Sequence, residues 1–571
     1  MTQARDARAA GAAVARASRE EAAERVAETY RRIKERGDDG VWITVRPEEE
    51  VLADLDRLDP DAPLYGVLFA VKDNIDVAGL PTTAACPGFA YRPERTAPLV
   101  ERLRAAGALL VGKTNLDQFA TGLSGMRTPY GVCEPPDAPG LIPGGSSSGS
   151  AVAVAAGLVD FAVGTDTAGS GRVPAAMTGT VGLKPSRGLV PTTGIVPACA
   201  SLDCASVFAP TVTGGAAALA VMAGPDPGDP WSRELPAPDP VAPGRGLRIG
   251  VPARPGFLGD EGAADGFAAA AERLARLGHE IVPVDMEPFL AAGSLLYEGP
   301  WLAERLAAVG DFLDAHPDQV HPVTRRVLEP GRRITGVDVF RGLHRLAELR
   351  AETARVWRGI DVLAVPTVPT TYTQAEMAAD PVGRNADLGR YTNFCNLLDL
   401  AAVAVPAGRT PAGRPHGVTL MAPAGTDGLL AGLAAAFLGE PVPPGPGDLT
   451  LLAVVGAHRT GHPLHPQLAA LGAVRHGLAY TAPVYRLHDL GDRPGMIRRP
   501  PGERIEVELH RVTPEALGRL LVSIPPPLGL GTVELDDGRR VHGFLCEPYA
   551  LADAPDITAY RSWPAYLASR G

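Results

Sequence analysis

Short apolar runs alternate with helix-like stretches along most of this chain, and this alternation limits the folds that it can adopt. The runs VLFAVKDNIDV (67–77), ALLVGKTNL (108–116) and LVDFAVGTDT (158–167) resemble buried strands, and APLVERLRAAG (97–107) has a helical pattern. Further strand-like runs follow at 246–253, 279–286, 361–369 and 401–408. Strands that alternate with helices are typical of an α/β domain. We therefore predict an α/β fold with a mixed or largely parallel β-sheet core flanked by helices.

The densest stretch of proline and glycine, GEPVPPGPGDLT (439–450), divides the chain. Proline there favours a semi-rigid spacer, and the pattern beyond it becomes β-rich. We predict a first domain at 1–440 that includes an N-terminal helical segment (7–36), a linker at 441–450 and a second domain at 451–571. A further boundary near 225–245 is the alternative. We interpret that loop-like stretch as a surface excursion within the first domain.

Composition excludes several classes of protein. The chain has 571 residues and a net charge of −11, which argues against a nucleic-acid-binding surface. Its six cysteines form no C-x-x-C pair, so the sequence indicates no zinc site and no disulfide scaffold. No apolar run reaches the 18 residues of a membrane span, and the N-terminus has no apolar signal core. We expect a cytoplasmic protein without metal, membrane or nucleic acid.

Three segments carry residues suited to catalysis. They are VKDNIDV with Lys72, the run PGGSSSGS (143–150) with Ser146, and GTDTAGSGR (164–172) with Ser170. PGGSSSGS alone is more typical of a loop, and it lacks the G-K-[ST] ending of a phosphate-binding loop. A serine becomes a good nucleophile when a neighbouring base removes its proton. A lysine can be that base if burial brings its pKa from about 10.4 to near 7–8.

In this order and spacing, the three segments resemble the amidase signature family of serine hydrolases. The resemblance implies an amidase signature fold and a Ser–Ser–Lys mechanism. Ser170 would be the nucleophile, Lys72 the base, and Ser146 the bridge that relays the proton between them. It also implies a cis peptide bond between Gly145 and Ser146.

The same resemblance assigns the residues around the nucleophile. Thr167, Ala168 and Gly169 would form the oxyanion hole, because small residues let backbone N–H groups converge on a developing negative charge. Alanine at 168 replaces the glycine common in the family but keeps its N–H donor. Arg172 has a supporting role in this interpretation.

Other stretches are similar to the allophanate hydrolase branch of the family, among them DQFATGLSGMRTPYG (117–131) and LLYEGPWLAERLAA (295–308). By this resemblance Gly122, Tyr297 and Arg305 would bind the substrate. Allophanate (N-carboxyurea) is a small anion, and a guanidinium can hold its carboxylate through two parallel hydrogen bonds. On one continuous helix, Tyr297 and Arg305 would lie near one face, about 12 Å apart. The alternative is that Tyr297 is packing and Arg305 a solvated charge.

Residues 451–571 are similar to the C-terminal domain of allophanate hydrolases, and the resemblance implies a small α+β domain like the γ-glutamyl cyclotransferase fold. The resemblance also implies that this domain processes N-carboxycarbamate, and His458 is the best positional match for the histidine involved. A domain that mainly stabilises assembly is the alternative. His458, His462 and His465 give a weak metal pattern, because Pro463 interrupts any helix. We predict no metal.

The sequence therefore predicts hydrolysis of allophanate to ammonia and carbon dioxide, by way of N-carboxycarbamate and without a cofactor, in the catabolism of urea or cyanuric acid. We expect a homodimer with a functional link to a separate urea carboxylase chain. Two alternatives remain: another small-molecule amidase or the glutaminase component of a tRNA amidotransferase, and a non-catalytic scaffold. The amidotransferase component would leave residues 451–571 without an explanation.

Overall fold

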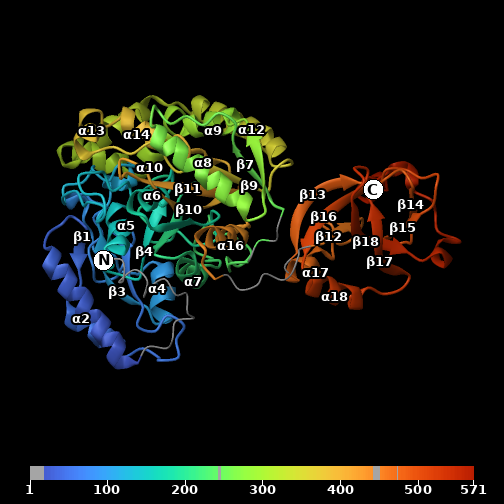
Figure 1. Cartoon of the computed structure of the whole chain (residues 1–571), viewed down its shortest axis with the longest axis horizontal. Coiled ribbons are helices and arrows are strands. Elements are labelled where there is room, and N and C mark those ends of the chain that lie inside the picture. Colours follow the sequence, from blue (N-terminus) through green and yellow to red (C-terminus); the bar gives the residue numbers. More distant parts are fainter. Residues whose placement is uncertain (1–17, 242, 244–245, 442–449, 472, 571) are drawn as a thin grey trace. The chain divides into compact units, whose positions relative to one another are not determined.

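The computed structural model describes residues 18–241, 243, 246–441, 450–471 and 473–570 (Figure 1). The chain divides into two compact units, Met1–Pro443 and Pro444–Gly571. Residues 442–449 of the predicted linker and residues 7–17 of the predicted N-terminal helical segment lie outside the described residues. The loop-like stretch near 225–245 belongs to the first unit and has no helix or strand among its described residues.

The first unit contains a mixed sheet of eleven strands in the order β1-β3-β2-β4-β6-β5-β10-β11-β9-β7-β8. Strand β2 is parallel to β3 and β4, whereas β4 and β6 are antiparallel, so the predicted mixed sheet is confirmed. The strands are β1 (Trp42–Val45), β2 (Leu68–Lys72), β3 (Leu109–Thr114), β4 (Phe161–Asp166), β5 (Val181–Lys184), β6 (Cys204–Ala209), β7 (Arg248–Pro252), β8 (Glu280–Val284), β9 (Val362–Pro366), β10 (Leu400–Arg409) and β11 (Pro415–Pro423).

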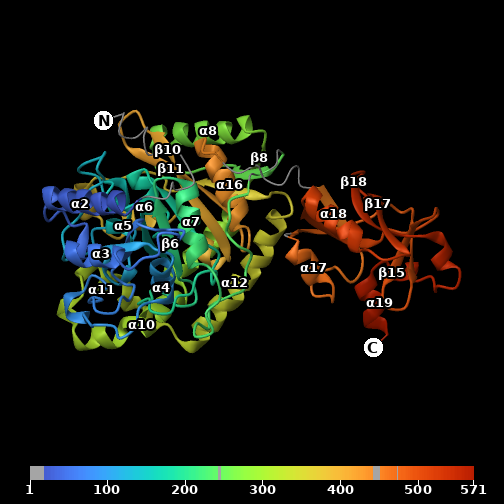
Figure 2. The same ribbon diagram turned by 90° about the horizontal axis from the view of Figure 1, so that it is seen from below.

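Helices flank this sheet. Helix α2 begins after a capping box of Ser18 and Glu21 and lies beside α3 (Figure 2). Helices α7 and α16 are almost wholly apolar and pack against the sheet and each other. The described α-helices of the first unit are α2 (Arg19–Arg36), α3 (Glu48–Leu55), α4 (Pro98–Ala105), α5 (Ser148–Ala155), α6 (Val173–Thr178), α7 (Val212–Met222), α8 (Glu261–Arg276), α9 (Glu287–Glu298), α10 (Trp301–Ala315), α11 (Pro322–Leu328), α12 (Gly336–Val356), α13 (Gln374–Ala379), α14 (Gly383–Leu388), α15 (Phe394–Leu397) and α16 (Asp427–Leu438).

Strands β2 and β4 place two polar residues at one edge of the sheet. Every residue of both strands is buried. Because the strands are parallel neighbours, their carboxyl ends meet, and Lys72 and Asp166 end them. The predicted strand at 67–77 is too long: after Lys72 the chain turns, and the Asp73 carboxylate accepts the N–H of Thr83 at 2.9 Å. This turn leaves Lys72 at the end of β2, next to Ser146 and to the end of β4 that leads to Ser170.

The second unit has the predicted α+β character. Its main sheet has five strands in the order β13-β16-β12-β18-β17, and β14 and β15 form a separate pair. Its elements are β12 (Thr450–Val454), α17 (His465–Ala470), β13 (Val474–Tyr480), β14 (Tyr485–Asp489), β15 (Pro494–Arg498), β16 (Glu506–Val512), α18 (Pro514–Ser523), β17 (Leu528–Glu534), β18 (Arg540–Cys546) and α19 (Trp563–Ser569). Among the described helices of both units, none combines the length and apolarity that crossing a bilayer requires.

Candidate active site

Lys72 and Ser146 meet in the interior of the first unit. The Lys72 Nζ donates a hydrogen bond to Ser146 Oγ at 2.7 Å and a second to Thr165 Oγ1 at 2.8 Å. Both Lys72 and Ser146 are fully buried. The peptide bond from Gly145 to Ser146 is cis, so this expectation is confirmed. The lysine thus has no solvent contact, and two hydroxyl groups receive its hydrogen bonds.

Burial lowers the pKa of Lys72 to about 7, because a charged ammonium is poorly solvated in the interior. The negative charges of Asp117, Asp203 and Asp166 act in the opposite direction and favour the ammonium form. A large share of the side chain is therefore a neutral amine near pH 7. A neutral amine at this position can accept a proton from the Ser146 hydroxyl.

Thr165, which the sequence patterns do not single out, is the second hydrogen-bond partner of Lys72. Ser147 Oγ donates to the Thr165 carbonyl oxygen at 3.1 Å and accepts from the Thr165 N–H at 3.3 Å. This reciprocal pair ties the serine loop to the end of β4. Thr165 stands in the segment that carries Ser170, but its contact with Lys72 follows from the pairing of two distant strands.

The loop from Thr167 to Ser170 follows β4. The Gly169 N–H donates to Asp166 Oδ1 at 2.9 Å, so this donor is already engaged. In the described part of the chain, the N–H groups of Thr167, Ala168 and Ser170 donate to no protein acceptor. The free donors next to the predicted nucleophile are therefore not the full set that the resemblance implies.

The Ser170 side chain lies in this loop and is 2% exposed. Within the described residues no hydrogen bond joins its hydroxyl to that of Ser146. Catalytic hydrogen bonds are often long before substrate binds, so this geometry is compatible with a proton relay.

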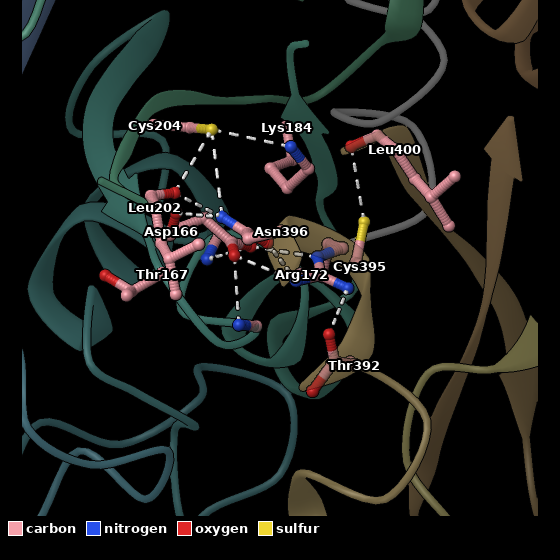
Figure 3. A network of polar contacts seen from close by, with 12 residues as sticks. Asp166, Thr167, Arg172, Lys184, Leu202, Cys204, Thr392, Cys395, Asn396 and Leu400 are labelled. Carbon is pink, nitrogen blue, oxygen red and sulfur yellow. Dashed lines mark hydrogen bonds and ion pairs between the residues drawn. The ribbon is translucent and has the colours of Figure 1, made fainter. Parts of the chain in front are cut away.

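A buried ion pair between Arg172 and Asp166 flanks the loop (Figure 3). Arg172 donates from Nε and Nη2 to the two oxygens of Asp166 at 2.9 and 2.8 Å, and both side chains are fully buried. Arg172 also donates to the Thr392 carbonyl oxygen at 3.1 Å, and Asn396 Nδ2 donates to the Asp166 carbonyl oxygen at 2.8 Å. Arg172 thus holds the Asp166 carboxylate, which in turn accepts the N–H of Gly169 in the loop. This contact is consistent with the supporting role expected for Arg172.

Asp203 supports the other end of the loop. Its carboxylate accepts a hydrogen bond from the Thr167 hydroxyl and from the N–H groups of Ala198 at 2.8 Å and Cys199 at 3.2 Å. Burial raises the pKa of Asp203 to about 6. A carboxyl group with a raised pKa beside the site marks a position that the sequence patterns miss.

Tyr297 and Arg305 come together, but not on one helix. Helix α9 ends at Glu298 and α10 begins at Trp301, because Gly299 is extended and Pro300 has no N–H for a continuing helix. The expected continuous helix is therefore wrong. The Arg305 guanidinium carbon lies 5.3 Å from the centre of the Tyr297 ring. The break folds two residues onto each other that one helix would have kept apart.

The Arg305 side chain is unusually short of partners. It is 2% exposed, and its Nη1 donates to Thr121 Oγ1 at 3.2 Å. Its Nε and Nη2 are buried without a hydrogen-bond partner. The positive charge of Arg305 acts on Asp203, whose carboxylate accepts from the Thr167 hydroxyl, so this guanidinium lies near the loop that carries Ser170.

The loop that contains Gly122 is joined to Ser146 through Asp117. The Asp117 carboxylate accepts the N–H groups of Gly125 at 2.9 Å and Arg127 at 2.8 Å, and the Asp117 N–H donates to the Ser146 carbonyl oxygen at 3.0 Å. A Cβ on Gly122 would lie 2.6 Å from Asp117 Oδ2. Glycine at 122 therefore allows close packing on Asp117.

His458 belongs to the second unit, whereas the residues described so far belong to the first. Its Nε2 lies 3.3 Å from Gln467 Oε1, and its ring stacks on Phe544 with 5.0 Å between centres. Burial lowers the pKa of His458. The rings of His465 and His510 are 6.0 Å apart. Across the described residues, no cluster of three or more His, Cys, Asp or Glu side chains is arranged to hold a metal ion.

A buried lysine hydrogen-bonded to a serine, next to a serine loop with free N–H donors, is the arrangement of a serine-dependent amide hydrolase. The comparisons agree with this class. The Amidase family model matches residues 24–431, and the model of the allophanate hydrolase C-terminal domain matches residues 450–568. The chain belongs to the amidase family and carries an allophanate hydrolase C-terminal domain.

Two of the known proteins that are similar to this chain match nearly its whole length, and a third matches a smaller part. A urea amidolyase from Saccharomyces cerevisiae is 39% identical over 93% of this chain, which spans 31% of that protein. The structure of Kluyveromyces lactis allophanate hydrolase is 36% identical, with a TM-score of 0.73 over 96% of this chain and 97% of that one. A glutamyl-tRNA(Gln) amidotransferase component from Synechococcus is 36% identical over 72% of this chain and 91% of its own length. The chain thus spans about a third of the urea amidolyase that it matches.

Proposed function

We propose that the chain hydrolyses allophanate to ammonia and N-carboxycarbamate. The observation that carries the proposal is the pair of unpartnered Arg305 donors, Nε and Nη2, buried beside Tyr297. An unpaired buried guanidinium is costly, and a substrate carboxylate would satisfy it in a bidentate geometry. The similarity to an allophanate hydrolase along nearly the whole chain supports the same substrate.

In the proposed reaction, Ser170 Oγ attacks the amide carbon of the substrate as its proton passes through Ser146 to the neutral Lys72 amine. The negative charge that develops on the carbonyl oxygen is bound by the free N–H groups of the Thr167–Ser170 loop. The proton returns to the leaving nitrogen, and ammonia departs. Water then attacks the acyl-enzyme by the same relay and releases N-carboxycarbamate and free Ser170.

The second unit acts on the product in this proposal. N-carboxycarbamate loses carbon dioxide to give carbamate, which breaks down to ammonia and a second carbon dioxide, and His458 takes part in the first of these losses. We further propose that the protein works as a homodimer in the cytoplasm and uses allophanate made by a urea carboxylase. Two findings support the link to a urea carboxylase: similar proteins are named urea amidolyase, and the allophanate hydrolase C-terminal domain matches this chain.

The test is ammonia release from allophanate by the full chain, with glutamine and malonamide as competing substrates. Turnover of allophanate that is lost in Ser170→Ala and strongly reduced in Arg305→Ala supports the substrate and both roles. Preference for glutamine, with an unchanged Arg305→Ala variant, would remove the allophanate assignment and favour the glutaminase alternative.

The role of the second unit needs a separate measurement. In a time course in which N-carboxycarbamate is trapped and measured, this intermediate should disappear more slowly in His458→Ala than in the wild type. The first ammonia should appear at the normal rate. His542→Ala is a control, since His542 lies on the exposed side of β18 in the same unit. Equal lifetimes of the intermediate in wild type and His458→Ala would exclude the proposed role of His458.

A further inference from the structure

Two buried arginines share one residue, Thr121. Arg305 donates from Nη1 to the Thr121 hydroxyl at 3.2 Å, and Arg127 donates from Nη1 to the Thr121 carbonyl oxygen at 2.8 Å. Arg305 is 2% exposed and Arg127 is 3% exposed. Thr121 therefore holds both guanidinium groups through its two oxygen atoms.

The hydrogen bonds that the Arg127 guanidinium makes in the described chain go to neutral oxygens. Besides Thr121, it donates from Nη2 to the carbonyl oxygen of Pro381 at 2.9 Å, and its Nε is buried without a partner. No ion pair joins Arg127 or Arg305 to a carboxylate among the described residues. Both cations thus keep donor capacity that protein groups do not use.

The acidic side chains whose charges act on these two arginines are Asp117, Asp203 and Glu304, and all three are engaged by other donors. Asp117 accepts the N–H groups of Gly125 and Arg127, at 2.9 and 2.8 Å. Glu304 accepts from the N–H and the hydroxyl of Ser201, both at 2.8 Å. These carboxylates offset part of the positive charge from a distance but do not pair with either guanidinium.

The two cations are close enough to act on each other. Burial lowers the pKa of Arg127, and the positive charge of Arg305 acts in the same direction. Two like charges in a poorly solvated place are costly unless an anion enters between or beside them. The residues around Thr121 are therefore more favourable to a bound anion than Arg305 alone would make them.

We propose that Arg127 is a specificity-determining positioning residue. It fixes Thr121, and through the Thr121 hydroxyl the Arg305 guanidinium, and its charge favours a substrate that ends in a carboxylate over a neutral amide of the same shape. The inference rests on the proposed function, because that carboxylate is the one of allophanate.

The test compares anionic and neutral substrates of equal shape. KM and kcat are measured for allophanate against biuret, in which a carboxamide replaces the carboxylate, and for malonamate against malonamide. Arg127→Gln should raise KM for the anionic member of each pair about tenfold and leave kcat/KM for the neutral member within about twofold. Arg127→Lys, which keeps the charge but loses the planar fork, should fall between wild type and Arg127→Gln.

Arg102→Gln is the matched control. Arg102 also donates to backbone carbonyl oxygens, those of Met222, Gly224 and Pro225, at 2.7, 2.9 and 2.9 Å. Its loss should leave the preference for the anionic substrates unchanged.

The outcomes separate this inference from the proposed function. An equal loss on anionic and neutral substrates, or no loss on either, would overturn the role of Arg127. If the wild type turns over malonamate but not allophanate, the proposed function fails and the malonamate pair still tests Arg127. If the wild type prefers the neutral member of both pairs, both proposals fall.

Discussion

The Lys72 Nζ and the Ser146 Oγ lie 2.7 Å apart, and neither side chain is exposed to solvent. A buried lysine usually pairs with a carboxylate, as Lys113 does with Asp73 at 3.2 Å. Lys72 is hydrogen-bonded to hydroxyl groups instead. Burial lowers the pKa of both lysines, but only at Lys113 does a directly adjacent carboxylate oppose that shift.

If Lys72 and Ser146 act as one relay, removing either should abolish the function of both. Lys72→Ala and Ser146→Ala are each expected to lower kcat by about 10³-fold, and the double variant should be no slower than either single variant. Single-turnover ammonia release measures this. Ser150→Ala is the control, because the buried Ser150 hydroxyl is bonded to Thr114 and to the Val163 carbonyl oxygen and should affect folding stability rather than kcat. Losses that multiply in the double variant would mean independent roles.

The pKa of Lys72, about 7, predicts the pH dependence of activity. The neutral amine is the active form, so kcat/KM should rise with pH and level off above a midpoint near pH 7. The same shift affects stability. The pKa in the folded state lies below the unfolded value of about 10.4, so between about 7 and 10.4 the unfolded chain binds more protons and the contribution of Lys72 to stability rises with pH.

Asp203→Asn gives a directional test of that profile. The negative charge of Asp203 favours the Lys72 ammonium, so its removal should lower the pKa of Lys72 and move the acidic limb to lower pH. Asp56→Asn, which removes an exposed carboxylate bonded to Arg19, should leave the limb in place. A limb that does not move in Asp203→Asn would mean that another group controls the profile.

Breaking the buried ion pair between Arg172 and Asp166 should lower the free energy of unfolding. Arg172→Met leaves the Asp166 carboxylate buried without its cation, which is expected to cost about 3–5 kcal/mol in urea unfolding. Arg19→Met, which breaks an exposed pair with Asp56, should have little measurable effect. A small loss in Arg172→Met would mean that Asp166 is satisfied by N–H groups alone.

The same pair predicts a pH effect. Burial alone would raise the pKa of Asp166, but the charge and hydrogen bonds of Arg172 hold it below the usual value. The contribution of Asp166 to stability is therefore present above its unfolded pKa of about 3.9 and is lost as pH falls through the lower folded value. In Arg172→Met this acid-side loss should disappear, and unfolding curves between pH 2 and 5 would detect it.

Sequence patterns could predict the elements whose evidence is local. The strand at β2, the serine loop and the loop before Ser170 each lie within one short segment, so their residue types are visible together. Strand β11 (Pro415–Pro423) has proline at both ends and does not stand out in the sequence, although it pairs with β10 and β9 inside the sheet. Its position depends on partners far along the chain, and local composition does not report them.

The candidate site shows the same limit. Thr165 contacts Lys72, 93 positions away, and Asp117 contacts Ser146. Arg127 is relevant through Thr121, which also binds Arg305, 184 positions from Thr121. The assumption of one helix through Tyr297 and Arg305 is wrong, because the Gly299–Pro300 pair ends α9. Reading Gly-Pro as a helix boundary would have predicted two helices and a close contact.

Gly145, the neighbour of Ser146, packs against Asp117 and Gly125. A Cβ there would lie 2.1 Å from Asp117 Oδ2 and 2.5 Å from the Gly125 nitrogen. Gly145→Ala must therefore displace Asp117, whose N–H holds the Ser146 carbonyl oxygen. We expect a folded protein, destabilised by about 1–3 kcal/mol, in which kcat is about 10²-fold lower because the relay serine has moved.

Thermal unfolding and single-turnover rates of the same preparations test this expectation. Gly336→Ala is the control, because a Cβ at this first residue of α12 meets no atom within 4 Å, and alanine there should be neutral or slightly stabilising. If Gly145→Ala loses stability but keeps its kcat, Asp117 does not position Ser146. If it keeps both, the loops have more freedom to separate than their hydrogen bonds indicate.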